Sequence, residues 1–170
     1  MKKLLALSVF LSLALLLTAC YHVVRIPDID PSDENSIGKP KTFESDGITL
    51  LLTDQFREQE SQVGFDAYYV ADFAGVMVLK EEFTLEEGLG EKTLENYTNG
   101  VIENNGHQNT QAQEKDGLWY YIKDTDTVRY YSFSYKGSDA FYIVQYSCFL
   151  SQTDEMEDTI FQWAKAVEVE

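Results

Sequence analysis

From Lys41 onward the chain contains no proline, and short apolar segments alternate with turn signals at regular spacing. The pairs Asp46-Gly47 and Asp116-Gly117 are typical of two-residue hairpin turns. Short segments joined by such turns predict strands of a largely antiparallel sheet. The strands that we expect are 41–44, 48–53, 65–70, 76–79, 109–115, 118–123, 128–136 and 141–150.

Two further segments show helical rather than strand periodicity. In the first, Thr93 is suited to cap the N-terminus, and Asn104-Asn105-Gly106 provides a left-handed stop. The second is predicted to begin between residues 151 and 153, where acidic side chains suit the free N–H groups of a helix start. Each amphipathic helix needs a sheet to cover. The apolar positions are Leu94, Tyr97 and Val101 in the first helix, and Met156, Ile160, Trp163, Ala164 and Val167 in the second.

The alternation of side chains along two strands predicts how the layers stack. Tyr131, Phe133 and Tyr135 point to one side of strand 128–136, and the other side is mixed. Strand 141–150 is largely apolar on both sides, so we expect it at the centre of the sheet with cover on both faces. The prediction is an α+β fold in which residues 41–170 form one α/β/α sandwich domain.

The order of segments is also informative. Phe43 precedes Asp46-Gly47-Ile48, Trp119-Tyr120 follows the second Asp-Gly pair, and a strand from Tyr142 to Cys148 leads into the helix that carries Trp163. With the Leu94 helix between them, these segments resemble the PsbP-like fold over about residues 41–169. That fold includes the extrinsic photosystem II protein, a Ran-GTPase nucleotide release factor and many bacterial lipoproteins. The resemblance implies a partner-binding or assembly protein rather than an enzyme, and it identifies no functional residue.

The first twenty residues have the pattern of an export signal. Met1-Lys2-Lys3 is cationic, and residues 4–17 form an apolar run that is shorter than the roughly 20 residues needed to span a bilayer core. The run ends in Leu17-Thr18-Ala19-Cys20, which resembles the lipobox of bacterial lipoproteins. We therefore expect residues 1–19 to be a lipoprotein signal peptide and Cys20 to carry the lipid. An ordinary signal peptide and a buried apolar helix with an incidental cysteine are the alternatives.

Residues 20–40 contain all three prolines, Pro27, Pro31 and Pro40, among acidic side chains, and predict an extended tether. The chain has 29 acidic and 13 basic side chains, a formal net charge of -16, which repels nucleic acid phosphates and anionic lipid headgroups. We therefore expect no nucleic acid partner. The predicted location is the extracytoplasmic face of the cell membrane, with acyl chains on Cys20 holding the protein there and a protein partner at the cell envelope.

Catalytic groups are sparse in the predicted domain. His107 is its only histidine, at the expected end of the first helix, where a loop or capping role is the simpler interpretation. Cys148 lies on an apolar strand face and is expected to be a small buried side chain. Asp124 and Asp126 have the spacing of a metal site but occupy a predicted turn. We expect no catalytic residue, no metal and no cofactor. The densest acids are interpreted as a solvated loop and helix approach, namely Glu81, Glu82, Glu86, Glu87, Glu91 and Glu95.

Aromatic side chains are the richest feature, since three successive strands carry Trp119 and seven tyrosines. On an open sheet these rings would bind sugars or a partner, whereas beneath helices they would form the core. The side with Tyr130, Ser132 and Ser134 is the best candidate for an exposed face. Three functions follow: a non-catalytic binding or assembly module, a solute or glycan binder that uses the tyrosine face, and a carboxylate-dependent hydrolase. The tyrosines are Tyr120, Tyr121, Tyr130, Tyr131, Tyr135, Tyr142 and Tyr146.

Overall fold

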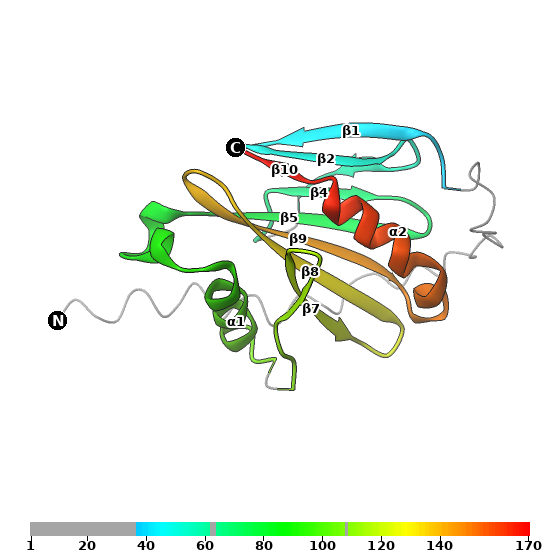
Figure 1. Ribbon diagram of the computed structural model, residues 1–170. Helices are drawn as coiled ribbons and strands as arrows, with labels where there is room; N and C mark the ends of the chain where they lie inside the picture. Colours follow the sequence, from blue (N-terminus) through cyan, green and yellow to red (C-terminus); the bar gives the residue numbers. More distant parts are fainter. Residues whose placement is uncertain (1–36, 62–63, 108) are drawn as a thin grey trace.

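The computed structural model describes residues 37–61, 64–107 and 109–170. The predicted signal peptide, Cys20 and the predicted tether up to residue 36 lie outside the described residues. Two antiparallel sheets and two α-helices make up the described part of the chain (Figure 1). Within these ranges, no helix is long and apolar enough to cross a membrane.

The larger sheet has seven strands in the order β3-β4-β5-β9-β8-β7-β6, and all neighbours are antiparallel. β9 is the central strand, as its two apolar sides predicted. Helix α1 lies on one face of this sheet and α2 on the other, which confirms the predicted α+β sandwich (Figure 1). The strands are β3 (Arg57–Gln59), β4 (Ala67–Val70), β5 (Ala74–Glu82), β6 (Gln113–Lys115), β7 (Leu118–Asp124), β8 (Val128–Lys136) and β9 (Ala140–Phe149).

The hairpin that opens the domain forms a small second sheet. β1 (Pro40–Ser45) pairs with β2 (Ile48–Thr53), and β10 (Glu168–Val169) pairs with the other edge of β2. The turn residues Asp46 and Gly47 have φ angles of 24° and 82°, the positive values that an Asp-Gly turn requires. The small sheet lies beside α2, over the same face of the larger sheet (Figure 1). The sequence pattern predicted the hairpin, but not the separate sheet or β10.

The two α-helices begin close to their predicted positions. α1 spans Leu94–Asn104, and the hydroxyl of Thr93 accepts a hydrogen bond from the Asn96 N–H at 3.2 Å, which confirms the predicted cap. α2 spans Thr153–Lys165 and has acidic side chains in its first turn. Three short 3-10 helices complete the described structure, η2 (Phe83–Leu85), η3 (Leu89–Glu91) and η4 (Leu150–Gln152).

The main core lies between the larger sheet on one side and α2 with the small sheet on the other. The ring of Trp163 in α2 packs edge-on against Phe56 at 5.4 Å and lies 6.2 Å from the ring of Tyr146. Phe161 meets Phe133 edge-on at 5.2 Å. Each large apolar side chain buried in this way contributes about 1.5–3 kcal/mol, so a domain of this size is held together by its core.

β5 is longer than the sequence pattern predicted. It spans Ala74–Glu82 rather than 76–79, so Glu81 and Glu82 end a strand, although we expected them in a loop. All nine residues of β5 pair with β9, from Ala74 opposite Cys148 to Glu82 opposite Ala140. The regular ladder of backbone hydrogen bonds therefore outweighs the low strand propensity of the two glutamates.

Candidate functional site

Most of the tyrosines on β7, β8 and β9 belong to the core rather than to a binding surface. The hydroxyl of Tyr135 donates to the Ala164 carbonyl at 2.8 Å, and that of Tyr131 donates to Glu157 at 3.1 Å. Of the two interpretations that the sequence left open, the core is therefore confirmed for six of the seven rings, because α1, α2 and the small sheet cover them. Tyr130 is the exception and is half-buried. The buried tyrosines of this set are Tyr120, Tyr121, Tyr131, Tyr135, Tyr142 and Tyr146.

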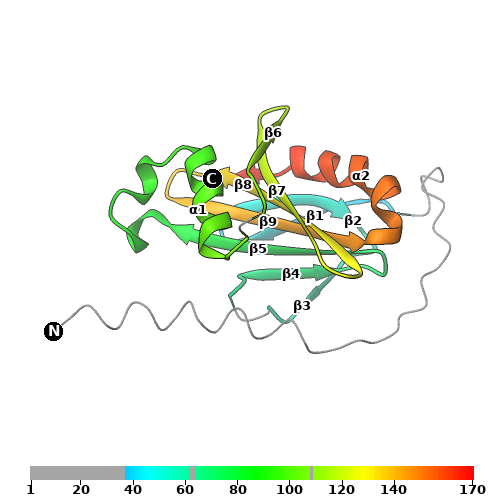
Figure 2. The same cartoon turned by 90° about the horizontal axis from the view of Figure 1, so that it is seen from below.

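Helix α1 covers only one end of the sheet face on which it lies. It packs on a small core in which the rings of Tyr97 and Phe141 stack 4.0 Å apart. The 11 residues of α1 give a helix about 16 Å long, whereas the 10 residues of β9 extend for about 33 Å. Among the described residues, no helix lies over the rest of this face, as Figure 2 shows from below.

We call this uncovered part of the sheet the open face. Its side chains are all half-buried, in contrast to the buried side chains beneath α1. Polar, aromatic and aliphatic groups are mixed on it, and they stand on the rigid strands of a packed sheet. The open face consists of Tyr68, Val70, Met77, Lys123, Val128, Tyr130, Gln145, Ser147 and Phe149.

The register of the strands places these side chains in two rows across the sheet. One row runs from Gly75 through Ser147 and Tyr130 to Lys123 on four neighbouring strands. Gly75 leaves room in this row, because a Cβ atom there would lie 2.8 Å from the Ser147 hydroxyl. The second row includes Gln145, which donates a hydrogen bond to the buried Ser132 hydroxyl at 2.9 Å.

The predicted face of Tyr130, Ser132 and Ser134 is therefore only partly open. Ser134 lies beneath α1, where it accepts a hydrogen bond from the Thr98 hydroxyl at 2.8 Å. Ser132 is buried beside Gln145, and Tyr130 is half-buried. The open part of the face is set by where α1 ends.

His107 lies at the edge of the open face, directly after the end of α1. Its backbone N–H donates to the Ile102 carbonyl at 3.0 Å, which closes the helix end where the sequence predicted it, and the residue is half-buried rather than exposed. The Lys123 ammonium lies 3.2 Å from His107 Nδ1, and the Tyr121 ring centroid lies 5.9 Å from the imidazole centroid. Burial and the charge of Lys123 lower the pKa of His107, so the imidazole is neutral near pH 7.

Cys148 lies on the opposite side of the sheet, in the main core. It is 3% exposed, as expected for a small buried side chain. Burial raises the pKa of its thiol to about 11, which disfavours the reactive thiolate. Because Cys148 and His107 face away from each other across the sheet, they do not form a nucleophile and base pair.

Two of the acidic candidates, Asp124 and Glu81, make close structural contacts. Asp124 accepts two hydrogen bonds from Arg129, at 2.7 and 2.8 Å, so its carboxylate is paired with a cation. Glu81 accepts a hydrogen bond from the Tyr97 hydroxyl at 2.5 Å. In the described ranges, no group of three or more histidine, cysteine or acidic residues is placed to hold a metal ion. These contacts do not favour a pair of catalytic carboxylates.

Two polar residues in the sequence indicated the open face, although the largely apolar strand around them predicted cover on both faces. Gln145 and Ser147 are polar positions on the α1 side of β9, the strand that we expected to be covered on both faces. Two polar side chains on one side of a central strand indicate that this side is not fully buried. Lys123, Met77 and Tyr68 carry no such signal, because each becomes part of the open face only through strand pairing.

This arrangement, a largely antiparallel sheet between two helices, defines a PsbP-like α+β fold. A solved structure with this fold is the solution structure of cyanobacterial PsbP (CyanoP) from Synechocystis sp. PCC 6803. It matches with a TM-score of 0.54 and 15% identity, over 81% of this chain and 96% of that one. A crystal structure from Bacteroides thetaiotaomicron gives a TM-score of 0.47 and 8% identity, over 79% of this chain and 49% of that one. No family model matches the chain, and no curated protein matches its sequence.

Proposed function

We propose that this protein is a non-catalytic binding or assembly module, anchored to the extracytoplasmic face of the cell membrane through lipid on Cys20. The observation that carries the binding role is the open face, a half-buried mixture of polar and apolar side chains on a rigid sheet. The separation of Cys148 from His107 and the paired state of Asp124 support a role without catalysis.

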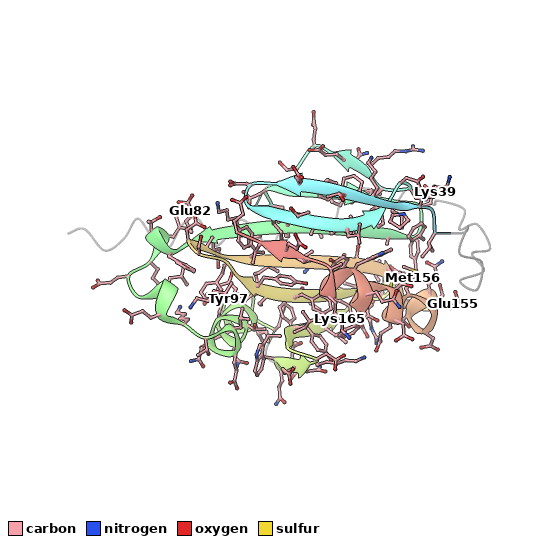
Figure 3. The ribbon with its side chains drawn as sticks, turned by 45° about the horizontal axis from the view of Figure 1, so that its top comes forward. Lys39, Glu82, Tyr97, Glu155, Met156 and Lys165 are labelled. Atoms are coloured by element: carbon pink, nitrogen blue, oxygen red, sulfur yellow. The ribbon has the colours of Figure 1, made fainter. Side chains whose placement is uncertain are left out.

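The charge of the domain supports a covalent anchor. Lys39, near the point where the described chain begins, lies at the same end of the molecule as Met156 and Glu155 near the start of α2 (Figure 3). Asp154 and Glu155 lie in the first turn of α2 at this end, and the whole chain has a net charge of -16, so anionic headgroups repel the domain and acyl chains are needed to hold it at a membrane.

Labelling with radioactive palmitate tests the anchor. The wild-type chain is expected to take up label and to fractionate with membranes, and Cys20→Ser is expected to lose both properties. Cys148→Ser is the matched control, because it removes the other cysteine of the chain and keeps the label. Label that persists in Cys20→Ser contradicts the proposed anchor.

Photo-crosslinking in intact cells tests the binding role. A benzophenone amino acid at Met77 or Gln145 is expected to give discrete crosslinked products. The same probe at Leu51 is the control, because Leu51 is 41% exposed on the small sheet. Equal yields at Met77, Gln145 and Leu51 contradict a specific role for the open face.

A solute or glycan binder is the second candidate, favoured by the half-buried rings of Tyr68 and Tyr130. Such rings stack on the apolar faces of sugars while their hydroxyls stay in water. Tyr68→Ala and Tyr130→Ala should then abolish binding in a glycan array with little change in melting temperature. Crosslinks to protein that survive both substitutions favour the assembly module instead.

A further inference from the structure

Lys123 differs from the other cations on the inner strands β5, β7 and β8 in the kind of group that it contacts. Lys80 and Arg129 each form an ion pair with a carboxylate, and Lys136 donates to backbone carbonyls. The ammonium of Lys123 is half-buried on the open face, and its contacts among the described residues are with the His107 ring, at 3.2 Å from Nδ1 and 3.5 Å from Nε2. Here a cation on a strongly acidic protein lies beside a base rather than an acid.

A neutral imidazole beside an ammonium leaves donors available. One ring nitrogen of His107 accepts from Lys123, so the other carries a proton and donates. The ammonium has three N–H donors, and the imidazole takes one of them. Lys123 and His107 therefore form a compact group of donors with one positive charge, at the end of the row that begins with Gly75.

We propose that Lys123 and His107 form a subsite of the open face that binds an oxyanion group of the ligand. This inference rests on the proposed binding role of the open face and names the chemistry that it recognises. The net charge of -16 makes most of the surface unfavourable for anions. Salt screens charges beyond the Debye length of about 8 Å at physiological ionic strength, so the distant acidic residues do not cancel the attraction of an anion to Lys123. Charge-assisted hydrogen bonds from these two groups hold the oxyanion.

Binding of an anion at this subsite is coupled to protonation of His107. The titratable groups in contact with His107 are Lys123 and Tyr121, both from β7, and burial together with the charge of Lys123 lowers the pKa of the imidazole. Lys123 disfavours the imidazolium, so a bound oxyanion that offsets this charge must raise the pKa of His107. By linkage, the anion then binds more tightly as the pH falls through the titration range of His107.

The test is an NMR titration of the mature lipidated protein in a neutral detergent, with sulfate as the probe because it stays ionised from pH 5 to 8. Sodium chloride keeps the ionic strength constant. We expect sulfate to raise the pKa of His107 by about one unit, which is a tenfold tighter affinity for the protonated form. His107→Asn assigns the signal against that of His22.

Three variants separate the subsite from a general effect of charge. Lys123→Gln should abolish the shift and Lys123→Arg should retain it, while Lys39→Gln, which removes an exposed cation directly before β1, should leave it unchanged. If the pKa of His107 does not change with sulfate, or changes equally in Lys123→Gln, the proposed subsite is wrong. If this sulfate effect is absent but Met77 and Gln145 still give crosslinks, the binding role of the open face is supported without the subsite. If sulfate binds but no crosslinks form, the subsite is supported and the binding role is contradicted.

Discussion

The hydroxyl of Tyr135 in β8 donates a hydrogen bond to the backbone carbonyl of Ala164 in α2, with 2.8 Å between the two oxygens. The bond is buried and joins the last turn of the helix to the sheet. Tyr135→Phe removes the donor and should lower the free energy of unfolding by about 1 kcal/mol, measured by urea denaturation. Tyr68→Phe is the control: Tyr68 is half-buried and its hydroxyl makes no hydrogen bond with the described residues, so the effect should stay within about 0.5 kcal/mol. Equal losses of stability in Tyr135→Phe and Tyr68→Phe would contradict a stabilising hydrogen bond from Tyr135 to Ala164.

Alkaline pH should unfold the domain cooperatively. Burial raises the pKa values of Tyr131, Tyr135 and Tyr146 above their ordinary value near 10. A raised pKa in the folded state means that the stabilisation is fully present below about pH 10 and is lost as the pH rises toward the folded pKa. Tyrosinate absorbance and circular dichroism should therefore change together above pH 10. A gradual tyrosine titration around pH 10 with the fold intact would contradict this burial.

Cys148 should be inert in the folded protein. With its pKa raised to about 11 by burial, only about one thiol in a thousand is ionised at pH 8. In Cys20→Ser, Cys148 is the only thiol, and it should react with a disulfide reagent only after unfolding in urea. Rapid reaction in buffer, before any loss of circular dichroism, would show that the thiol is accessible.

Two glycines should respond to alanine in opposite directions. Gly100 lies inside α1 with open space where a Cβ would be, so Gly100→Ala should raise the free energy of unfolding by about 0.5–1 kcal/mol. Gly47 has a φ of 82°, and a Cβ there would overlap the Tyr142 hydroxyl, so Gly47→Ala should destabilise the domain. Urea denaturation of both variants measures the two changes in the free energy of unfolding. Changes of the same sign would contradict this explanation from backbone geometry.

Local chemistry explains which elements were predictable from the sequence. The turns at Asp46-Gly47 and Asp116-Gly117 adopt positive φ at all four residues, because Asp and Gly tolerate this region better than most residues. The cap at Thr93 is likewise set by the side chain itself. These features depend on residues close in sequence, so the strands and helices that they bound could be placed within a few positions.

Elements that depend on distant partners could not be placed in this way. β3, with the sequence Arg57-Glu58-Gln59, has no apolar pattern and is a strand because it pairs with β4. The burial of Tyr131 and Tyr135 under α2 likewise follows from the packing of whole layers. For the open face, the length of α1 was readable from the sequence, but the position at which it crosses the sheet was not.

The pairing of β10 with β2 means that the small sheet cannot be completed early in synthesis. β1 and β2 are synthesised long before β10, yet the backbone of Glu170 bonds to Gly47 and to Ser138, so the third strand of the small sheet can join only after α2 has been made. Until β10 has been synthesised, one edge of β2 has no partner strand. An incomplete chain exposes that edge, so premature termination should yield a species prone to self-association.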